Sequence, residues 1–243
     1  MATALLVALC AGFYSCGGDN DETPLNNDDN SNISNENGNS VIVGTTAMVQ
    51  LKKVGALSTL ISDNVKFNIT DLRIMGDING DDIALIREMA GADVKGNETN
   101  GKLANLNLSN ANLVNGGIYY TGITQEVSSS NELWQYMFYK CGSLTSIVLP
   151  NNIAHIGAFA LSYSGITSFT IPNNIQTIGN EAFANCTKLE SIVIGNSIVS
   201  AAENMLDGCI NLKKIRMLSD NSTYILLVFI TIEQPKLIRN IRV

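Results

Sequence analysis

LTSIVLPNNI stands at residues 144–153, ITSFTIPNNI follows at residues 166–175, and LESIVIGNSI follows at residues 189–198. A fourth copy begins at Leu212 and continues with Ile215 and Met217. Successive copies are offset by 22, 23 and 23 residues. A period of this length is typical of proteins in which one structural unit stacks on the next.

Each copy predicts a β-strand that ends in a turn. Its last apolar positions alternate with polar ones, as one buried face of a strand requires. Pro150 or Gly195 and the asparagine that follows it then end the strand, because proline has no N–H for a ladder and asparagine adopts turn conformations readily. About 15 residues return the chain to the next strand, so the strands are expected to be parallel. A single copy buries too little apolar surface to offset its loss of conformational entropy, and the copies must therefore stack.

The strand pattern also occurs twice before the regular copies, as Ile69-Thr-Asp-Leu72-Arg-Ile74 and Leu103-Ala-Asn-Leu106-Asn-Leu108. A helix that begins near Asp81 and ends at Gly91 is predicted between these two strands. A single entering strand is predicted over residues 41–51. The long interval from residue 110 to residue 131 is predicted to loop outward.

The cysteine-containing unit, Ala182-Phe183-x-x-Cys186-x-x-Leu189-x-x-Ile192-x-Ile194, is similar to the BspA-like class of leucine-rich repeats in bacterial surface antigens. The resemblance covers residues 41 to 217. It implies an α/β fold, namely a right-handed leucine-rich-repeat solenoid with a curved parallel sheet, mostly β with short helical returns and an N-terminal helical cap. It also implies surface exposure and adhesion or other protein binding, without catalysis.

We predict five segments. Residues 1–15 are expected to be a lipoprotein signal peptide, and residues 16–40 an acylated cysteine with a disordered tether. Residues 41–131 are expected to form an N-terminal cap with irregular first repeats, and residues 132–217 the regular repeats. Residues 218–243 are expected to be an irregular C-terminal cap or a truncated end.

The N-terminal prediction depends on an apolar run over residues 4–14, which has the length of a signal-peptide core. Phe-Tyr-Ser-Cys at residues 13–16 resembles a bacterial lipobox, which implies that Cys16 is the lipid attachment site. A buried terminal helix is the alternative. No Lys or Arg precedes the apolar run, so the true start is expected to lie upstream.

The formal net charge is −7, and residues 17–40 contribute six acidic residues with no Lys or Arg. This segment is also rich in asparagine and poor in large aliphatic residues, which favours a disordered tether. The rest of the chain is close to neutral and lacks the basic surface of a nucleic-acid binder, so no nucleic-acid partner is predicted. Acidic residues just after Cys16 resemble the surface-export signal of bacterial lipoproteins.

Three groups of residues are possible sites of metal or covalent chemistry. Asp77, Asn79, Asp81 and Glu88 have the spacing of a calcium loop, but position six is not glycine, and strand-end and helix-cap roles account for the same residues. Cys141, Cys186 and Cys209 recur at one position of successive copies and are interpreted as a buried column of thiols, although a Cys186–Cys209 disulfide is compatible with the expected spacing. His155, the only histidine, is expected to be an exposed loop residue without a catalytic partner. We therefore predict no enzyme activity, no cofactor and no metal.

The candidate binding face consists of outward-pointing positions on the predicted strands. One column is Asp71, Asn105, Ser146, Ser168, Ser191 and Lys214. The other is Arg73, Asn107, Val148, Thr170, Val193 and Arg216. Neither column contains an aromatic residue, which disfavours sugar stacking on this face. The alternative is that these columns only solvate the sheet.

The leading hypothesis is a lipid-anchored protein of the bacterial outer membrane, exposed on the cell surface. It is expected to be a monomer, to contact the membrane only through its anchor, and to bind a protein ligand of host or bacterial origin. The alternative is a surface glycan-binding lipoprotein, with Trp134, Tyr136 and Tyr139 as the aromatic residues concerned. A truncated, non-functional gene fragment is the third hypothesis.

Overall fold

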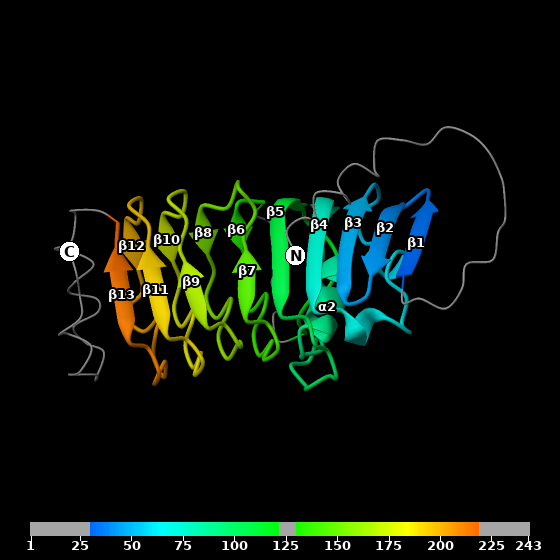
Figure 1. Cartoon of the computed structure of the whole chain (residues 1–243). Helices are drawn as coiled ribbons and strands as arrows, with labels where there is room; N and C mark the ends of the chain where they lie inside the picture. The colour runs from blue at the N-terminus through cyan, green and yellow to red at the C-terminus, as the bar shows by residue number, and fades with distance from the viewer. Residues whose placement is uncertain (1–29, 122–129, 219–243) are drawn as a thin grey trace.

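The computed structural model describes residues 30–121 and 130–218 of the chain. In this part successive elements follow one another along an elongated array in the order of the sequence (Figure 1). They form sheets of six, four and three strands. The predicted signal peptide, Cys16, the tether up to residue 29 and the segment from residue 219 onward lie outside the described residues.

The six-stranded sheet has the order β1-β2-β3-β4-β5-β7. Its strands are β1 (Asn30–Asn35), β2 (Gly38–Val43), β3 (Thr46–Leu51), β4 (Asp71–Ile78), β5 (Asn105–Leu113) and β7 (Ser146–Val148). The pairs β1–β2 and β2–β3 are antiparallel, whereas β3–β4, β4–β5 and β5–β7 are parallel. The two early strand patterns are thus the strands β4 and β5, which lead directly to the first regular copy.

The later copies form the three-stranded parallel sheet β9 (Ser168–Thr170), β11 (Ser191–Ile194) and β13 (Lys214–Met217). Ile192 lies opposite Phe169 on one side and opposite Ile215 on the other, so these three residues are in register. Ile147 of β7 is in register with Leu106 of β5, and no strand pairing joins β7 to β9 in the described chain. The predicted stacking of apolar residues is therefore confirmed within two blocks, which the β7–β9 boundary separates.

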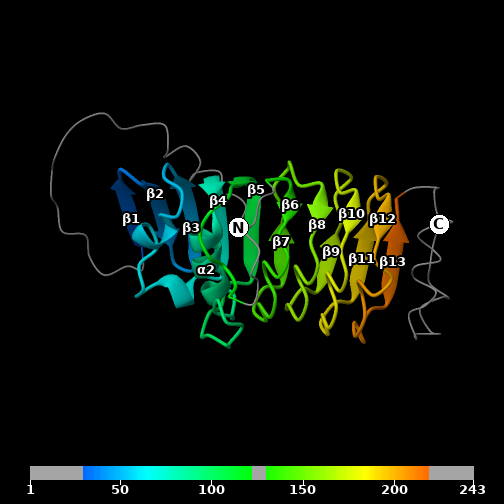
Figure 2. The same ribbon diagram turned by 180° about the vertical axis from the view of Figure 1, so that it is seen from behind.

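A second parallel sheet, here called the back sheet, has the order β12-β10-β8-β6. Its strands are β6 (Glu132–Leu133), β8 (His155–Ile156), β10 (Thr177–Ile178) and β12 (Ser200–Ala201). Figure 2 shows this row of short strands running alongside β7, β9, β11 and β13. Each copy contributes one strand to each row, and the core lies between the rows.

One continuous apolar core runs through the described chain. It includes the column residues Phe169, Ile192 and Ile215, of which Ile192 is wholly buried. The side chains on the neighbouring positions, such as Val193, point away from it and are partly exposed. The period-two alternation of each strand thus divides it into a core face and an outward face.

Asparagines at the strand ends join one copy to the next. The Asn174 side-chain amide donates to the Asn151 carbonyl at 3.2 Å, and Asn152 donates in the same way to the Ser130 carbonyl at 3.0 Å. The Asn196 backbone N–H donates to the Asn173 side-chain oxygen at 3.2 Å. The asparagines predicted to end the strands therefore also hold neighbouring copies together.

Helix α2 (Gly80–Met89) is fixed at its N-terminus by a capping box. The Asn79 side chain accepts from the Asp81 and Asp82 N–H groups, and the Asp82 carboxylate accepts from the Asn79 N–H. Asp82 also accepts from Gly55 and Leu57, which attaches the helix to the segment containing the 3-10 turn η2 (Leu57–Thr59). Burial raises the pKa of Asp82, although its three backbone N–H donors oppose this shift.

The C-terminal half of α2 is tied to the first regular copy by Arg87, which is fully buried. Its guanidinium donates to the carbonyls of Tyr136 and Met137 at 3.0 Å and to those of Asp93 and Tyr139 at 3.0 and 3.1 Å. It also lies 5.1 Å from the ring centroid of Tyr120. The buried Arg87 cation is thus stabilised by carbonyl dipoles and an aromatic ring, and it supplies a hydrogen-bond donor to four backbone carbonyls.

Several predictions about the N-terminal region and the returns are wrong. Residues 30–40 belong to β1 and β2 rather than to a disordered tether, because pairing with the next strand supplies the backbone hydrogen bonds that their polar composition alone does not indicate. The single entering strand over residues 41–51 is instead β2 and β3, separated by a turn at Gly44, whose φ is +57°. This hairpin, not a helix, ends the six-stranded sheet.

The short helical returns are also absent from residues 130–218, where turns and the two-residue strands of the back sheet connect the copies. Backbone bonds between successive returns explain this difference. Phe138 donates to the Ala160 carbonyl at 2.8 Å, and Leu161 donates to the Ala182 carbonyl at 2.8 Å. Alternate N–H groups of the return are used between copies and are unavailable for a helix within one copy. The helices that the described chain does contain, α2, η2 and η3 (Lys66–Asn68), all precede the regular copies.

Among the described residues, no helix has both the length and the apolar character needed to cross a lipid bilayer.

We expect Ile192→Ala to lower the free energy of unfolding by roughly 2–5 kcal/mol, because it leaves a cavity in the in-register column. Val193→Ala, on the outward face of the same strand, should change it by about 0.5 kcal/mol or less. Urea denaturation followed by circular dichroism measures both. Equal effects of the two substitutions would contradict the assignment of the two faces.

We expect Arg87→Met to lower the free energy of unfolding by about 3 kcal/mol or more, because several buried carbonyls lose their donor. Lys66→Met is the matched control, since it removes a cation that contacts α2 from the solvent side. That substitution should cost about 1 kcal/mol or less, because the Asp63 and Glu88 carboxylates of the ion pair are exposed and solvent screens the interaction. A loss for Arg87→Met no larger than the loss for Lys66→Met would show that Arg87 does not hold the junction.

Candidate functional site

The candidate site is the outward face, defined as the outward-pointing side chains of β4, β5, β7, β9, β11 and β13. The structure brings the predicted columns together in two blocks. In the first, Asp71, Asn105 and Ser146 are direct neighbours, as are Arg73, Asn107 and Val148. In the second, Ser168, Ser191 and Lys214 are direct neighbours, as are Thr170, Val193 and Arg216. The predicted adjacency is confirmed within each block, and the binding role of these residues remains a prediction.

The first block is internally hydrogen-bonded. The Asn105 amide donates to Asp71 Oδ1 at 2.8 Å, and the Thr70 hydroxyl donates to Asp71 Oδ2 at 2.7 Å. The Asn107 side-chain oxygen accepts from the Ser109 N–H at 3.0 Å. Much of the polar capacity of this block is therefore used within the protein.

The second block ends in exposed positive charge. Lys214 and Arg216 are both exposed on β13, and no carboxylate of the described chain forms an ion pair with either. Their neighbour Lys213 pairs with Glu190 at 3.2 Å, with both side chains largely exposed. Lys214 and Arg216 thus remain available to an acidic ligand.

Between the two blocks lies a slot of about 360 Å³. It is lined by β7, β9 and the turns that follow them, namely Ser146, Ile147, Val148, Leu149, Pro150, Asn151, Ser168, Phe169, Thr170, Pro172 and Asn174. Ser146, Ser168 and Thr170 form a polar rim, whereas Ile147, Leu149 and Phe169 are apolar and almost fully buried. Four of the predicted face residues, Ser146, Val148, Ser168 and Thr170, therefore line a cavity, which strand patterns alone did not indicate.

A cluster of aromatic side chains lies away from the outward face, on the returns of the first two regular copies. We call it the aromatic ridge, and it consists of Tyr120, Tyr136, Tyr139, Phe159 and Tyr163. Tyr136 stacks on Phe159 with centroids 4.7 Å apart and on Tyr120 at 5.1 Å. Tyr139 contacts Tyr163 edge-on at 5.7 Å, and Tyr163 is 48% exposed. The ridge thus presents several partly exposed rings together.

Three ridge residues have the left-handed backbone conformation that favours glycine: Tyr136 (φ 59°), Phe159 (φ 57°) and Tyr163 (φ 58°). Lys140, Glu181 and Asn185 share this conformation at corresponding positions of the repeat. The inter-copy bonds of the returns impose it, as when the Tyr163 N–H donates to the Ala184 carbonyl at 2.9 Å. These side chains therefore point outward although their conformation is costly for bulky residues.

Of the aromatic residues named from the sequence, Trp134 does not belong to the ridge. It is 2% exposed and packs on Tyr119 at 5.2 Å, so it is a core residue. Phe159 and Tyr163 were missed, although the repeat offset of 23 residues from Tyr136 and Lys140 leads directly to them.

Residues 121–229 match the model of the BspA type leucine rich repeat region in six copies. This part of the chain carries BspA-type leucine-rich repeats. The match begins after β5, so β4 and β5 lie outside it, although β4 pairs with β5 and β5 pairs with β7. No curated protein matches the chain.

Several solved structures are similar to the chain at low identity. A leucine-rich repeat protein from Bacteroides ovatus shares 17% identity with a TM-score of 0.35, covering 80% of this chain and 71% of that one. A leucine-rich repeat protein from T. pallidum shares 16% with a TM-score of 0.34, covering 81% and 71%. A leucine-rich cell surface protein from Faecalibacterium prausnitzii shares 12% with a TM-score of 0.26, covering 82% and 86%.

The cysteine column of the BspA-type repeats is a set of free, buried thiols. Cys186 donates to the Leu161 carbonyl and Cys209 to the Phe183 carbonyl, both at 3.1 Å. Burial raises the pKa of Cys141 to about 11 and that of Cys209 to about 12. Each thiol is thus protonated at neutral pH, as the predicted thiol column requires, and the Cys186–Cys209 disulfide is not formed. Cys186 and Cys209 each fasten a turn to the preceding copy.

The prediction that His155 is an exposed loop residue is wrong. His155 lies on β8, where it is partly buried and its Nδ1 lies 2.8 Å from the Thr177 hydroxyl. Glu132 of β6 is the neighbour of His155 in the back sheet. Burial raises the pKa of Glu132, and the adjacent imidazole opposes this shift. Within the described chain no hydrogen bond or ion pair joins Glu132 to His155, so an acid-oriented imidazole of the catalytic-triad type is not formed.

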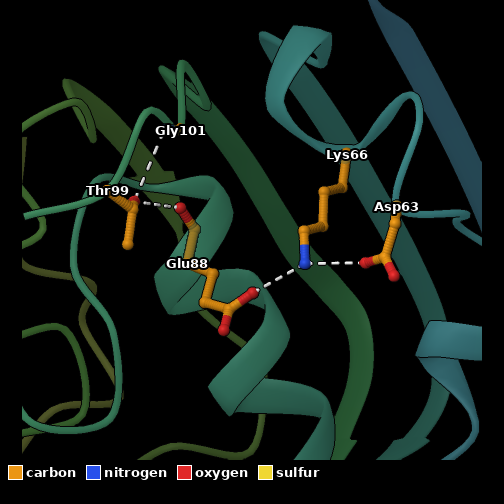
Figure 3. Close-up of polar contacts among 5 residues, drawn as sticks. All are labelled: Asp63, Lys66, Glu88, Thr99 and Gly101. Atoms are coloured by element: carbon orange, nitrogen blue, oxygen red, sulfur yellow. Dashed lines mark hydrogen bonds and ion pairs between the residues drawn. The ribbon is translucent and has the colours of Figure 1, made fainter.

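The residues with calcium-loop spacing are used in other interactions. Asn79 and Asp82 form the capping box, and Asp77 accepts from the Asn112 amide at 3.0 Å. Figure 3 shows Glu88 paired with Lys66, whose Nζ lies 2.9 Å from Glu88 and 2.7 Å from Asp63. These two carboxylates, Asp63 first, raise the pKa of Lys66. Over residues 30–121 and 130–218, no group of three or more His, Cys, Asp or Glu residues is arranged to hold a metal ion.

Proposed function

We propose that this chain is a lipid-anchored protein of the bacterial outer membrane that binds another protein at the cell surface and catalyses no reaction. In this proposal the BspA-type repeats form a right-handed solenoid, since parallel strand connections are right-handed in nearly all proteins. Cys16 carries the lipid, and the segment after it holds the repeats away from the membrane. The protein acts as a monomeric adhesin.

The observation that carries the proposal is the outward face. Repeat proteins commonly bind partners through the extended surface of their stacked strands. Here the face contains two blocks of neighbouring side chains, a cavity between them and the exposed cations Lys214 and Arg216. A protein ligand can contact such a surface at several points at once.

The surface location is supported by the repeats and by the relatives. BspA-type repeats favour exposure on the cell. A similar structure is described as a leucine-rich cell surface protein from Faecalibacterium prausnitzii, which also favours this location. The lipobox-like residues before Gly17 favour the anchor. Protease treatment of intact cells followed by mass spectrometry tests both, because it releases exposed repeats and identifies the mature N-terminus.

We expect the chain to bind at least one member of a panel of purified extracellular-matrix and bacterial surface proteins in surface plasmon resonance. Lys214→Ala/Arg216→Ala should weaken that binding about tenfold, which is about 1.4 kcal/mol. Lys52→Ala/Lys53→Ala is the matched control, because it removes the same charge from exposed positions beyond β3. If both double variants bind as the native chain does, the outward face is not the binding surface.

A glycan-binding surface lipoprotein is the second candidate, and the aromatic ridge favours it. Partly exposed rings, such as Tyr163 next to Tyr139, are the side chains on which sugar rings stack. This surface is distinct from the outward face, so the two candidate functions predict effects of different substitutions.

If the ridge binds glycans, Tyr163→Asn should abolish binding on a glycan array while preserving the fold. Asparagine tolerates the left-handed conformation and already occupies the corresponding position of the next copy as Asn185. Asn185→Gly is the matched control, because glycine stands there in the last copy as Gly208. A native chain that binds no glycan on the array would exclude this candidate.

A further inference from the structure

The aromatic ridge ends between the second and third regular copies. Tyr136 and Phe159 occupy the same place in the first two copies and stack with their ring planes 2° apart and their centroids at 4.7 Å. Glu181 occupies this place in the third copy and has the same left-handed backbone conformation, with φ 53°. A carboxylate therefore stands where the next ring of the stack would lie.

The neighbouring place of the repeat changes in the same way. Tyr163 of the second copy is 48% exposed, and the third copy has Asn185 at this place with φ 57°. An asparagine side chain is shorter than a tyrosine side chain, so it leaves the outer part of the Tyr163 ring uncovered on the side of the third copy. Phe159 and Tyr163 thus end the ridge, and we call their boundary with Glu181 and Asn185 the ring step.

The carboxylate at the ring step lacks a positive partner. Glu181 is partly buried, and its N–H donates to the Asn204 side-chain oxygen at 3.3 Å. Over the described residues, no Lys, Arg or His forms an ion pair with it. Burial raises the pKa of Tyr136, and Tyr120 and the Glu181 carboxylate raise it further, so this charge lies close enough to act on the rings. A cation placed here gains both an ion pair and contact with an aromatic face.

The other end of the same stack already carries a cation. Tyr120 stacks on Tyr136 at 5.1 Å, and the Arg87 guanidinium lies 5.1 Å from the centroid of Tyr120. Lys140 lies over the Tyr139 ring in the same way, at 5.5 Å. The rings of the ridge are therefore suited to cations, and the ring step is the end at which the described chain supplies none.

The geometry of the ring step favours a planar cation. A guanidinium is flat, presents a fork of donors to a carboxylate and stacks on aromatic faces, whereas an ammonium is a compact point charge. Tyr136 and Phe159 lie 4.7 Å apart, which is also the spacing of adjacent strands. A flat group therefore fits at the level of the third copy without moving the copies apart, and it approaches from solvent, because side chains at these places point outward.

We propose that the ring step binds an arginine side chain of the protein partner. The guanidinium lies on the outer part of the Phe159 and Tyr163 rings, at the level of the third copy, and donates to the Glu181 carboxylate. The inference rests on the proposed binding of a protein partner, and it adds a second contact on a surface distinct from the outward face. The two contacts have opposite charge, since the outward face presents Lys214 and Arg216 to an acidic part of the partner.

The test titrates the full chain with acetyl-Gly-Ser-Arg-Ser-Gly-amide, up to about 10 mM so that a millimolar Kd is detected, and follows backbone amide signals by NMR. The signals of Glu181 and Asn185 should shift in a saturable manner, and that of Ile192 should not. Peptides with lysine or citrulline in place of arginine should bind about fivefold more weakly or less, because lysine lacks the planar fork and citrulline lacks the charge. Equal binding of the arginine and lysine peptides, or no saturable shift with the arginine peptide, would overturn the proposal.

Glu181→Gln keeps the shape of the side chain and removes its charge, so it should weaken binding of the arginine peptide about fivefold or more. Tyr163→Asn removes the exposed ring and should also weaken it. Glu203→Gln is the matched control, since it removes an exposed carboxylate in the next copy and should change binding less than about twofold. If Glu181→Gln binds the peptide as tightly as Glu203→Gln does, the ring step is not the site.

Failure of this inference can be distinguished from failure of the proposed function. Lys214→Ala/Arg216→Ala should bind the arginine peptide as the native chain does, because the two surfaces are separate. A panel protein that binds Glu181→Gln as tightly as the native chain, with no peptide binding to either, overturns the ring step and leaves the outward face intact. Glycan binding without any binding of the arginine peptide also overturns it and assigns the ridge to sugars. Loss of panel binding in Glu181→Gln, with native folding, supports the inference.

Discussion

The fold depends on the register of apolar side chains between successive copies. A single copy cannot stand alone, because its few buried residues do not offset the conformational entropy of its backbone. Ile192 between Phe169 and Ile215 shows how the requirement is met, since each side chain is covered by its equivalents in the adjacent copies. The ends of such a stack need a different solution. At the N-terminal end the antiparallel strands β1 and β2 provide it, and Arg87 joins that region to the first regular copy through four carbonyls.

The same register produces the outward face. Because strand side chains alternate, the residues next to the buried column point to solvent and form columns of their own. The register that aligns the buried side chains therefore also decides which exposed side chains are neighbours. Stability restricts the buried positions to apolar side chains, whereas the exposed positions differ from copy to copy. The chain uses this freedom unevenly: the first block is internally bonded through Asp71 and Asn105, the middle is small and neutral, and the last strand is basic.

Sequence predicted the parts of the fold that repeat and missed those that occur once. The positions of β7, β9, β11 and β13, the turn asparagines and the adjacency of the surface columns all follow from periodicity. The strand β1 was missed because its asparagines indicate disorder, and only pairing with β2 orders it. Phe159 and Tyr163 of the ridge were missed for another reason. Their backbone conformation arises from hydrogen bonds between returns, such as that from Phe159 to Asn180, and bulky residues such as Phe159 give no local signal of positive φ.

The slot illustrates how a repeat protein tolerates the loss of one strand pairing. Proline is a suitable residue for ending a strand, and Pro150 and Pro172 both do so, but it also removes a donor that the neighbouring copy would need. The loss is tolerated because the back sheet continues through the same two copies, with Thr177 paired to His155, and because Asn174 bridges the turns. The two rows of strands therefore have separable roles. The back sheet pairs these two copies in register even where the front strands β7 and β9 are not hydrogen-bonded to each other.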